Sequence, residues 1–69
     1  MNQIRLPKYH IGDTICFWAR TDSSQSHELF VMTIRRMFQR HGLWYYDMEG
    51  DFYEIEGWAE CNIIGKCTL

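Results

Sequence analysis

The sequence lacks the features that would direct a protein to a membrane or to an oxidising compartment. No apolar run reaches the ~18 residues that a membrane-spanning helix needs, and the N-terminus has no apolar segment of the signal-peptide kind. The three cysteines, Cys16, Cys61 and Cys67, are odd in number and have no framework spacing. We therefore expect three free thiols, no disulfide, no membrane association and a cytoplasmic protein.

Signatures of metal binding and catalysis are missing as well. The cysteines and histidines form no Cys-x-x-Cys or His-x-x-x-His pair, and too few acids lie around residues 47–51 for an EF-hand loop. No nucleophile lies in an elbow or helix-start motif. A domain this small is also expected to have little room for a pocket of ~300 Å³. We expect no enzymatic activity, no metal and no cofactor.

The composition is that of a folded protein with a rich core. The chain has 69 residues, of which 46% are hydrophobic and 16% aromatic. A chain of this length buries only about 60% of its unfolded surface. Each large apolar side chain that becomes fully buried contributes about 1.5–3 kcal/mol, so this core can stabilise one small domain. We expect a single domain over residues 1–69, with its core in residues 11–64.

Alternating apolar residues and turn signals predict an all-β fold of five short strands. The predicted strands are residues 14–20, 28–39, 43–48, 52–56 and 61–64. A polar loop is expected at residues 21–27, and a 3-10 or tight turn at residues 57–60, before the last strand. The expected core residues are Ile15, Phe17, Ile34, Trp44 and Ile55.

The segment 28–39 fits two periods. As a strand, it places Phe30, Met32, Ile34, Arg36 and Phe38 on one face. As a helix, it forms a stripe of Phe30, Ile34, Met37 and Phe38. Its β-branched residues and the neighbouring strands favour the strand, and a strand this long is expected to bend and serve two sheets of a small barrel.

The chain contains three short motifs: IGDTI at residues 11–15, GLWYY at residues 42–46, and Ile55 followed by GWAECNI at residues 57–63. They resemble motifs of SH3-like barrels, and of Tudor-like barrels in particular. The resemblance implies a small five-stranded SH3-like barrel with a short 3-10 turn before the last strand. It also implies a recognition module, since such domains bind modified or proline-rich peptides, nucleic acid or other proteins. The chain lacks the acidic opening of SH3 ligand domains and a clear Tudor aromatic cage.

Charge and aromatic residues are concentrated in residues 42–60, which contain no lysine or arginine. Residues 1–46 hold six basic and three acidic residues, a net charge of +3, whereas residues 47–69 hold one basic and six acidic residues, a net charge of −5. If these rings are exposed, rings beside carboxylates suit a partner with a basic surface; the alternative is that the rings cap the ends of the barrel as part of its core. The expected partner-binding residues are Tyr45, Asp47, Glu49, Asp51, Tyr53, Glu54 and Glu56. The sequence thus favours a non-enzymatic protein-binding module, such as a small accessory or phage-encoded or mobile-element-encoded inhibitory protein that acts on a nucleic-acid-binding partner.

Nucleic-acid binding is the alternative. Arg35, Arg36 and Arg40 could contact phosphates beside a platform of stacked rings. A sequence pI of about 5.8 weakens this reading, and the arginines could instead pair with acids across the sheet.

Overall fold

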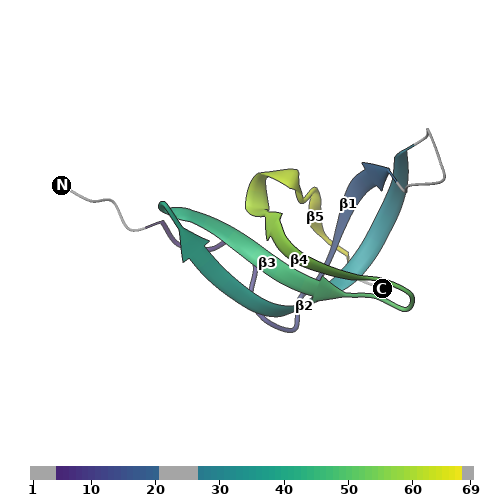
Figure 1. Ribbon diagram of the computed structural model, residues 1–69, viewed down its shortest axis with the longest axis horizontal. Helices are drawn as coiled ribbons and strands as arrows, with labels where there is room; N and C mark the ends of the chain where they lie inside the picture. Colours follow the sequence, from purple (N-terminus) through teal and green to yellow (C-terminus); the bar gives the residue numbers. More distant parts are fainter. Residues whose placement is uncertain (1–4, 21–26, 68–69) are drawn as a thin grey trace.

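The computed structural model describes residues 5–20 and 27–67, which form a single antiparallel β-sheet (Figure 1). The strands are β1 (Thr14–Arg20), β2 (His27–Arg40), β3 (Leu43–Glu49), β4 (Glu54–Ala59) and β5 (Gly65–Lys66). The one helical segment in this part of the chain is the 3-10 turn η1 (Glu60–Asn62). The all-β prediction is therefore confirmed, and residues 28–39 form a strand rather than a helix.

The long strand β2 joins two halves of the sheet. The strand order is β4-β3-β2-β1-β5; β2 pairs with β1 over residues 27–33 and with β3 over residues 33–40. The rings of Phe17 on β1 and Trp58 on β4 lie 4.7 Å apart although these strands are not neighbours in the sheet. The sheet therefore curls so that its two halves face each other (Figure 1). It is not closed: β4 and β5 are its two edges, and no pairing joins them.

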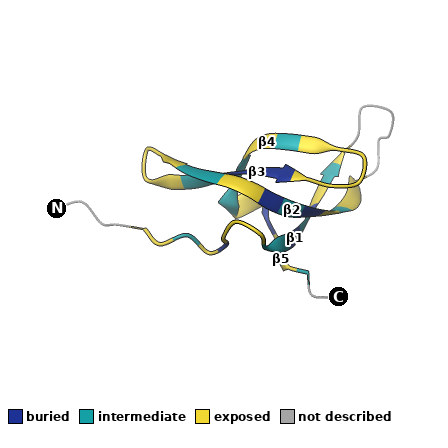
Figure 2. Cartoon of the chain, turned by 90° about the horizontal axis from the view of Figure 1, so that it is seen from below, coloured by how far each residue is buried: buried dark blue, intermediate teal, exposed yellow. Residues whose placement is uncertain are grey.

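The core lies between the two halves, on the concave side of the sheet. Its buried members are Tyr9, Ile15, Phe17, Met32, Ile34, Tyr46, Met48 and Ile63. Buried positions lie along the middle of β1, β2 and β3, whereas the hairpin ends are exposed (Figure 2). The predicted burial of Ile15, Phe17 and Ile34 is confirmed. Trp44 and Ile55 are only half-buried, packed against the edge of this core.

A β-bulge at Arg35 changes which side chains of β2 face the core. Ile34 pairs with Met48 and Arg36 with Asp47, so Arg35 is an extra residue on β2. The bulge reverses the alternation beyond it, and Met37 rather than Phe38 packs against the core. The predicted single face from Phe30 to Phe38 is therefore wrong after Ile34.

The C-terminal boundaries also differ from the prediction. Strand β4 begins at Glu54 rather than at residue 52 and runs through Gly57 to Ala59, so the 3-10 turn falls at Glu60–Asn62. Gly57 lies in a second bulge at a φ of 70°, a left-handed conformation that glycine adopts without strain, and the strand continues past it.

The predicted last strand at residues 61–64 is wrong. Residues 61 and 62 belong to the 3-10 turn, and the side chain of Ile63 enters the core. Pairing with β1 is established at the Ile64 N–H, which donates to the Cys16 carbonyl at 2.8 Å, and β5 follows. The predicted polar loop covered residues 21–27. His27 is the first residue of β2, and residues 21–26 lie outside the described residues.

Candidate functional site

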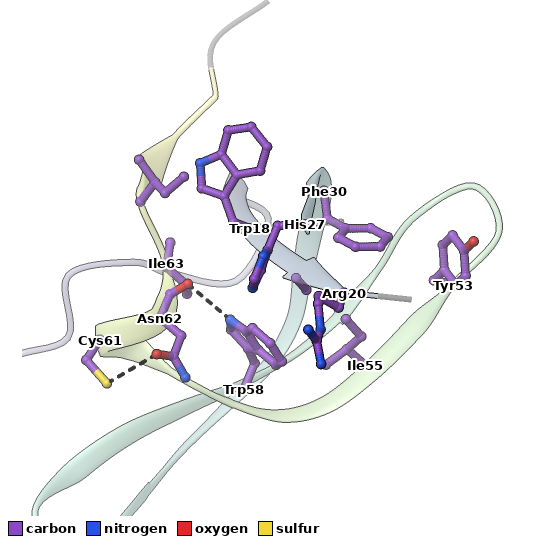
Figure 3. Close-up of a pocket in the computed structure, with 12 residues that line it drawn as sticks. Trp18, Arg20, His27, Phe30, Tyr53, Ile55, Trp58, Cys61, Asn62 and Ile63 are labelled. Carbon is purple, nitrogen blue, oxygen red and sulfur yellow. Dashed lines mark hydrogen bonds between the residues drawn. The ribbon is translucent and has the colours of Figure 1, made fainter. Parts of the chain in front are cut away.

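An open groove lies at the gap between the two halves of the sheet (Figure 3). We call it the aromatic groove; its volume is about 900 Å³. Its lining includes Trp18, Phe30, Tyr53, Ile55 and Trp58, and is completed by Ala19, Arg20, His27 and residues 61–64. The expectation that so small a domain has little room for a pocket was wrong, because the open sheet leaves this hollow at the surface.

Ring-to-ring packing fixes the floor of the aromatic groove. Phe17 and Phe30 are cross-strand partners whose rings stack at 5.6 Å, and Trp58 packs on Phe17 from β4. Tyr53 meets the Phe30 ring edge-on, with 5.4 Å between the ring centroids. Rings held in such contacts have little freedom to lose when a ligand binds.

The rim of the aromatic groove is exposed. Trp18 is 55% exposed and Tyr53 is 51% exposed. The Trp58 indole N–H is already satisfied, because it donates to the Asn62 carbonyl at 3.3 Å. The groove therefore offers aromatic and apolar surface together with two nitrogen-bearing side chains, Arg20 and His27, which lie among the rings in Figure 3.

The seven predicted partner-binding residues do not form one surface. Tyr53 lines the aromatic groove, and Asp51, Glu54 and Glu56 are exposed on the β3–β4 hairpin beside it. Glu49 is exposed on the same hairpin. Tyr45 lies elsewhere, with its ring stacked on Phe38 at 5.8 Å, towards the β2–β3 turn. These are two separate aromatic regions, and the Phe38–Tyr45 stack is half-buried.

Asp47 is buried rather than part of an acidic surface. It is 3% exposed, accepts a hydrogen bond from the Gly57 N–H at 2.8 Å and pairs with the Arg36 guanidinium at 2.8 Å. Burial opposes its ionisation, but the Gly57 and Arg36 hydrogen bonds outweigh burial and hold the pKa of Asp47 below its usual value. Its carboxylate ties the β4 bulge to β2.

The predicted arginine cluster is largely paired with the predicted acids. Arg35 lies 3.5 Å from Glu49 and 3.4 Å from Glu54, and Arg36 pairs with Asp47. Arg40 instead lies over the Phe38 ring, 5.6 Å from its centroid. The sheet thus brings two of the three arginines together with acids that sequence reasoning had assigned to a different surface.

A second buried polar contact anchors the 3-10 turn. The Tyr46 hydroxyl donates to the Glu60 carboxylate at 2.6 Å, and the Lys8 N–H donates to the same oxygen at 3.0 Å. Burial, and then the bond to Glu60, raise the pKa of Tyr46 well above its usual value. This contact positions η1 and therefore the end wall of the aromatic groove.

Sequence reasoning did not include Trp18, Phe30 and Trp58 among the site residues. Trp18 could have been found, because strand alternation places its side chain on the face of β1 that does not carry the core residues Ile15 and Phe17. Trp58 could not, because the predicted turn at residues 57–60 removed it from a strand.

Among residues 5–20 and 27–67, no helix is long and apolar enough to cross a membrane. In the same residues, no group of three or more His, Cys, Asp or Glu side chains is arranged to hold a metal ion. The chain matches no protein-family model, no curated protein and no solved structure.

Proposed function

We propose that this chain is a non-enzymatic protein-binding module whose binding site is the aromatic groove. One observation carries the proposal: an open hollow of about 900 Å³ is walled by rings, two of which are half-exposed. Aromatic side chains in concave surfaces dominate the energetics of protein recognition. An exposed apolar hollow of this kind marks an interaction site more often than a solvated surface.

The charge beside the groove indicates a basic partner. The β3–β4 hairpin exposes Glu49, Asp51, Glu54 and Glu56, and Arg35 is the one basic group within ion-pair distance of any of them in the described residues. Such an excess of acid attracts a basic surface and speeds its association. A nucleic-acid-binding protein has such a surface, which fits an accessory or inhibitory role for this chain.

The nucleic-acid alternative is weaker. It needs free arginines, but Arg35 and Arg36 already have carboxylate partners, and only Arg40 of the predicted three has none in the described residues. Phosphate contacts would have to displace these ion pairs.

We further propose that the curled sheet is an SH3-like barrel that remains open at the groove. Three features support this: terminal strands at the two edges, a central strand bent at a bulge, and a 3-10 turn before the last strand. The aromatic groove would then be the opening of the barrel between strand β4 and the half of the sheet that contains β1.

Capture of partners from an extract of the source organism tests the proposal. Tyr53→Ala removes a groove ring, whereas Phe52→Ala removes its neighbour, which is 90% exposed and does not line the groove. We expect the same partner to be captured by the parent chain and by Phe52→Ala, and to be lost with Tyr53→Ala. A partner retained equally by all three proteins would contradict the assignment of the site.

A further inference from the structure

The strand that borders the aromatic groove has a free edge. β4 is the last strand of the sheet, at its upper edge in Figure 2, and pairs only with β3 in the described residues. The opposite edge, β5, spans two residues, whereas β4 spans six. Proteins commonly protect free edges with lysine, proline or very short strands. β4 contains neither lysine nor proline.

The backbone of β4 presents hydrogen-bonding groups along this edge. The Gly50 N–H donates to the Tyr53 carbonyl at 2.8 Å, so the backbone groups of Gly50 and Tyr53 face each other across the hairpin. Bonding alternates along an antiparallel ladder, which directs the peptide groups of Glu54 and Glu56 away from β3. Within the described residues, neither glutamate makes a further backbone bond to a turn, loop or cap.

Side chains on this edge alternate between two chemistries. Tyr53 and Ile55 line the aromatic groove, whereas Glu54 and Glu56 point to the other face and are exposed. Glu54 shares Arg35 with Glu49, and Glu56 has no ion-pair partner in the described part of the chain. A strand added here would meet apolar surface on one face and carboxylates on the other.

We propose that the aromatic groove takes an extended segment of the partner protein as an added strand on β4, and that this segment alternates Lys or Arg with bulky apolar residues. The inference rests on the proposed function and names the chemistry of its ligand. Main-chain bonds to Glu54 and Glu56 hold the segment, its apolar side chains enter the groove beside Tyr53 and Ile55, and its basic side chains stand opposite the glutamates. A second copy of the chain is disfavoured, because antiparallel pairing of two β4 edges sets glutamates against glutamates.

Three synthetic octapeptides test this inference by fluorescence anisotropy. The first alternates Lys and Val, the second has the same composition in two blocks, and the third alternates Glu and Val. We expect the alternating Lys-Val peptide to bind about tenfold more tightly than the block peptide, because only the alternating one can satisfy both faces. It should also slow amide hydrogen exchange at Glu54 and Glu56. Equal affinity of all three peptides, or no binding at millimolar concentration, would overturn the inference.

Variants of the β4 edge separate charge from backbone pairing. Glu54→Lys with Glu56→Lys should reverse the preference to the Glu-Val peptide. Glu56→Pro removes one outward N–H and should weaken binding about tenfold relative to the matched control Glu56→Ala, which loses the same charge and keeps the N–H. Thermal unfolding verifies that each variant is folded; if Glu56→Pro does not fold, the charge reversal decides.

The failure of this inference can be distinguished from failure of the proposed function. If Tyr53→Ala abolishes capture of the natural partner, but the alternating peptide shows no preference and Glu54 and Glu56 stay unprotected, the groove binds without strand addition and the inference is wrong. Concentration-dependent protection of β4 without peptide would identify a second copy as the occupant and also overturn it.

Discussion

The two hairpins that share β3 are both rich in aromatic residues, but the β2–β3 hairpin carries the arginines and the β3–β4 hairpin carries an excess of acids. Towards the β2–β3 turn, Phe38 stacks on Tyr45 and Arg40 lies over the Phe38 ring, so rings and charge are matched within the hairpin. In the β3–β4 hairpin, Tyr53 faces the aromatic groove, and the exposed acids Glu49, Asp51, Glu54 and Glu56 outnumber Arg35, the one arginine that pairs with any of them in the described residues. The comparison indicates that aromatic and charged residues mark a binding site where other side chains of the same domain do not already pair with them.

Asp47 lies between the hairpins and should show the largest effect on stability. Asp47→Ala leaves the Gly57 N–H without its acceptor and frees Arg36, which we expect to lower the free energy of unfolding by about 2–3 kcal/mol. The matched variant Glu56→Ala removes an exposed acid from the β3–β4 hairpin and should change the free energy of unfolding by less than about 0.5 kcal/mol. Urea unfolding measures both. Equal losses would mean that Asp47 is not the link between the hairpins.

The same carboxylate gives the stability a pH dependence. Because the pKa of Asp47 is lowered in the folded state, its contribution is present above the unfolded pKa of about 3.9 and is lost as the pH falls through the lower folded value. Urea unfolding from pH 7 down to pH 2 should therefore show stability falling at the acid end. Asp47→Asn should reduce that acid-side fall, and an unchanged slope would contradict the assigned cause. Asp13, whose pKa is also lowered, should leave a residual slope.

Tyr45 and Tyr53 should separate stability from binding. Tyr45→Ala removes the stack on Phe38 and should lower the free energy of unfolding by about 1 kcal/mol without changing partner affinity. Tyr53→Ala removes the edge-on contact with Phe30 and should lower the free energy of unfolding by a similar amount, but it should also weaken partner affinity. Parallel denaturation and binding measurements on the two variants check this. Loss of partner affinity with Tyr45→Ala but not with Tyr53→Ala would contradict the assignment of the binding site to the aromatic groove.

Arg35 should give only a small change in stability. Its ion pairs with Glu49 and Glu54 are exposed, so Arg35→Ala should lower the free energy of unfolding by only about 0.2–1 kcal/mol. The hairpin then carries more uncompensated acid, and a basic partner should associate faster, with a steeper dependence on salt. Stopped-flow association at two salt concentrations measures this. Slower association would indicate that Arg35 itself contacts the partner.

Local patterns in the sequence predicted the strands but not the places where the strands change phase. Strand β1 and the strand nature of residues 28–39 follow from alternation and β-branched residues, and both are confirmed. The bulges at Arg35 and Gly57 depend on contacts between strands, chiefly the Asp47 carboxylate, which no local pattern contains. Those bulges decide that Asp47 is buried and that Trp58 reaches the groove.

Pairing across the sheet likewise limited the prediction of the site. Tyr53 was identified, and pairing of the arginines with acids across the sheet was anticipated, but the acids that they meet, Glu49 and Asp47 among them, had been assigned to the partner-binding surface. Tyr9 shows the same limit, since an irregular lead-in supplies a core ring that meets Tyr46 edge-on at 5.9 Å. Neither contact has a signal in the local sequence.

Hydrogen-exchange footprinting of the chain with its captured partner tests the central claim most directly. We predict that partner binding slows exchange at the β4 amides and at residues 18–20, which border the aromatic groove, and leaves residues 38–45 unchanged. Protection confined to residues 38–45, with β4 exchanging as in the free chain, would contradict the account and place the binding site on the Phe38–Tyr45 stack.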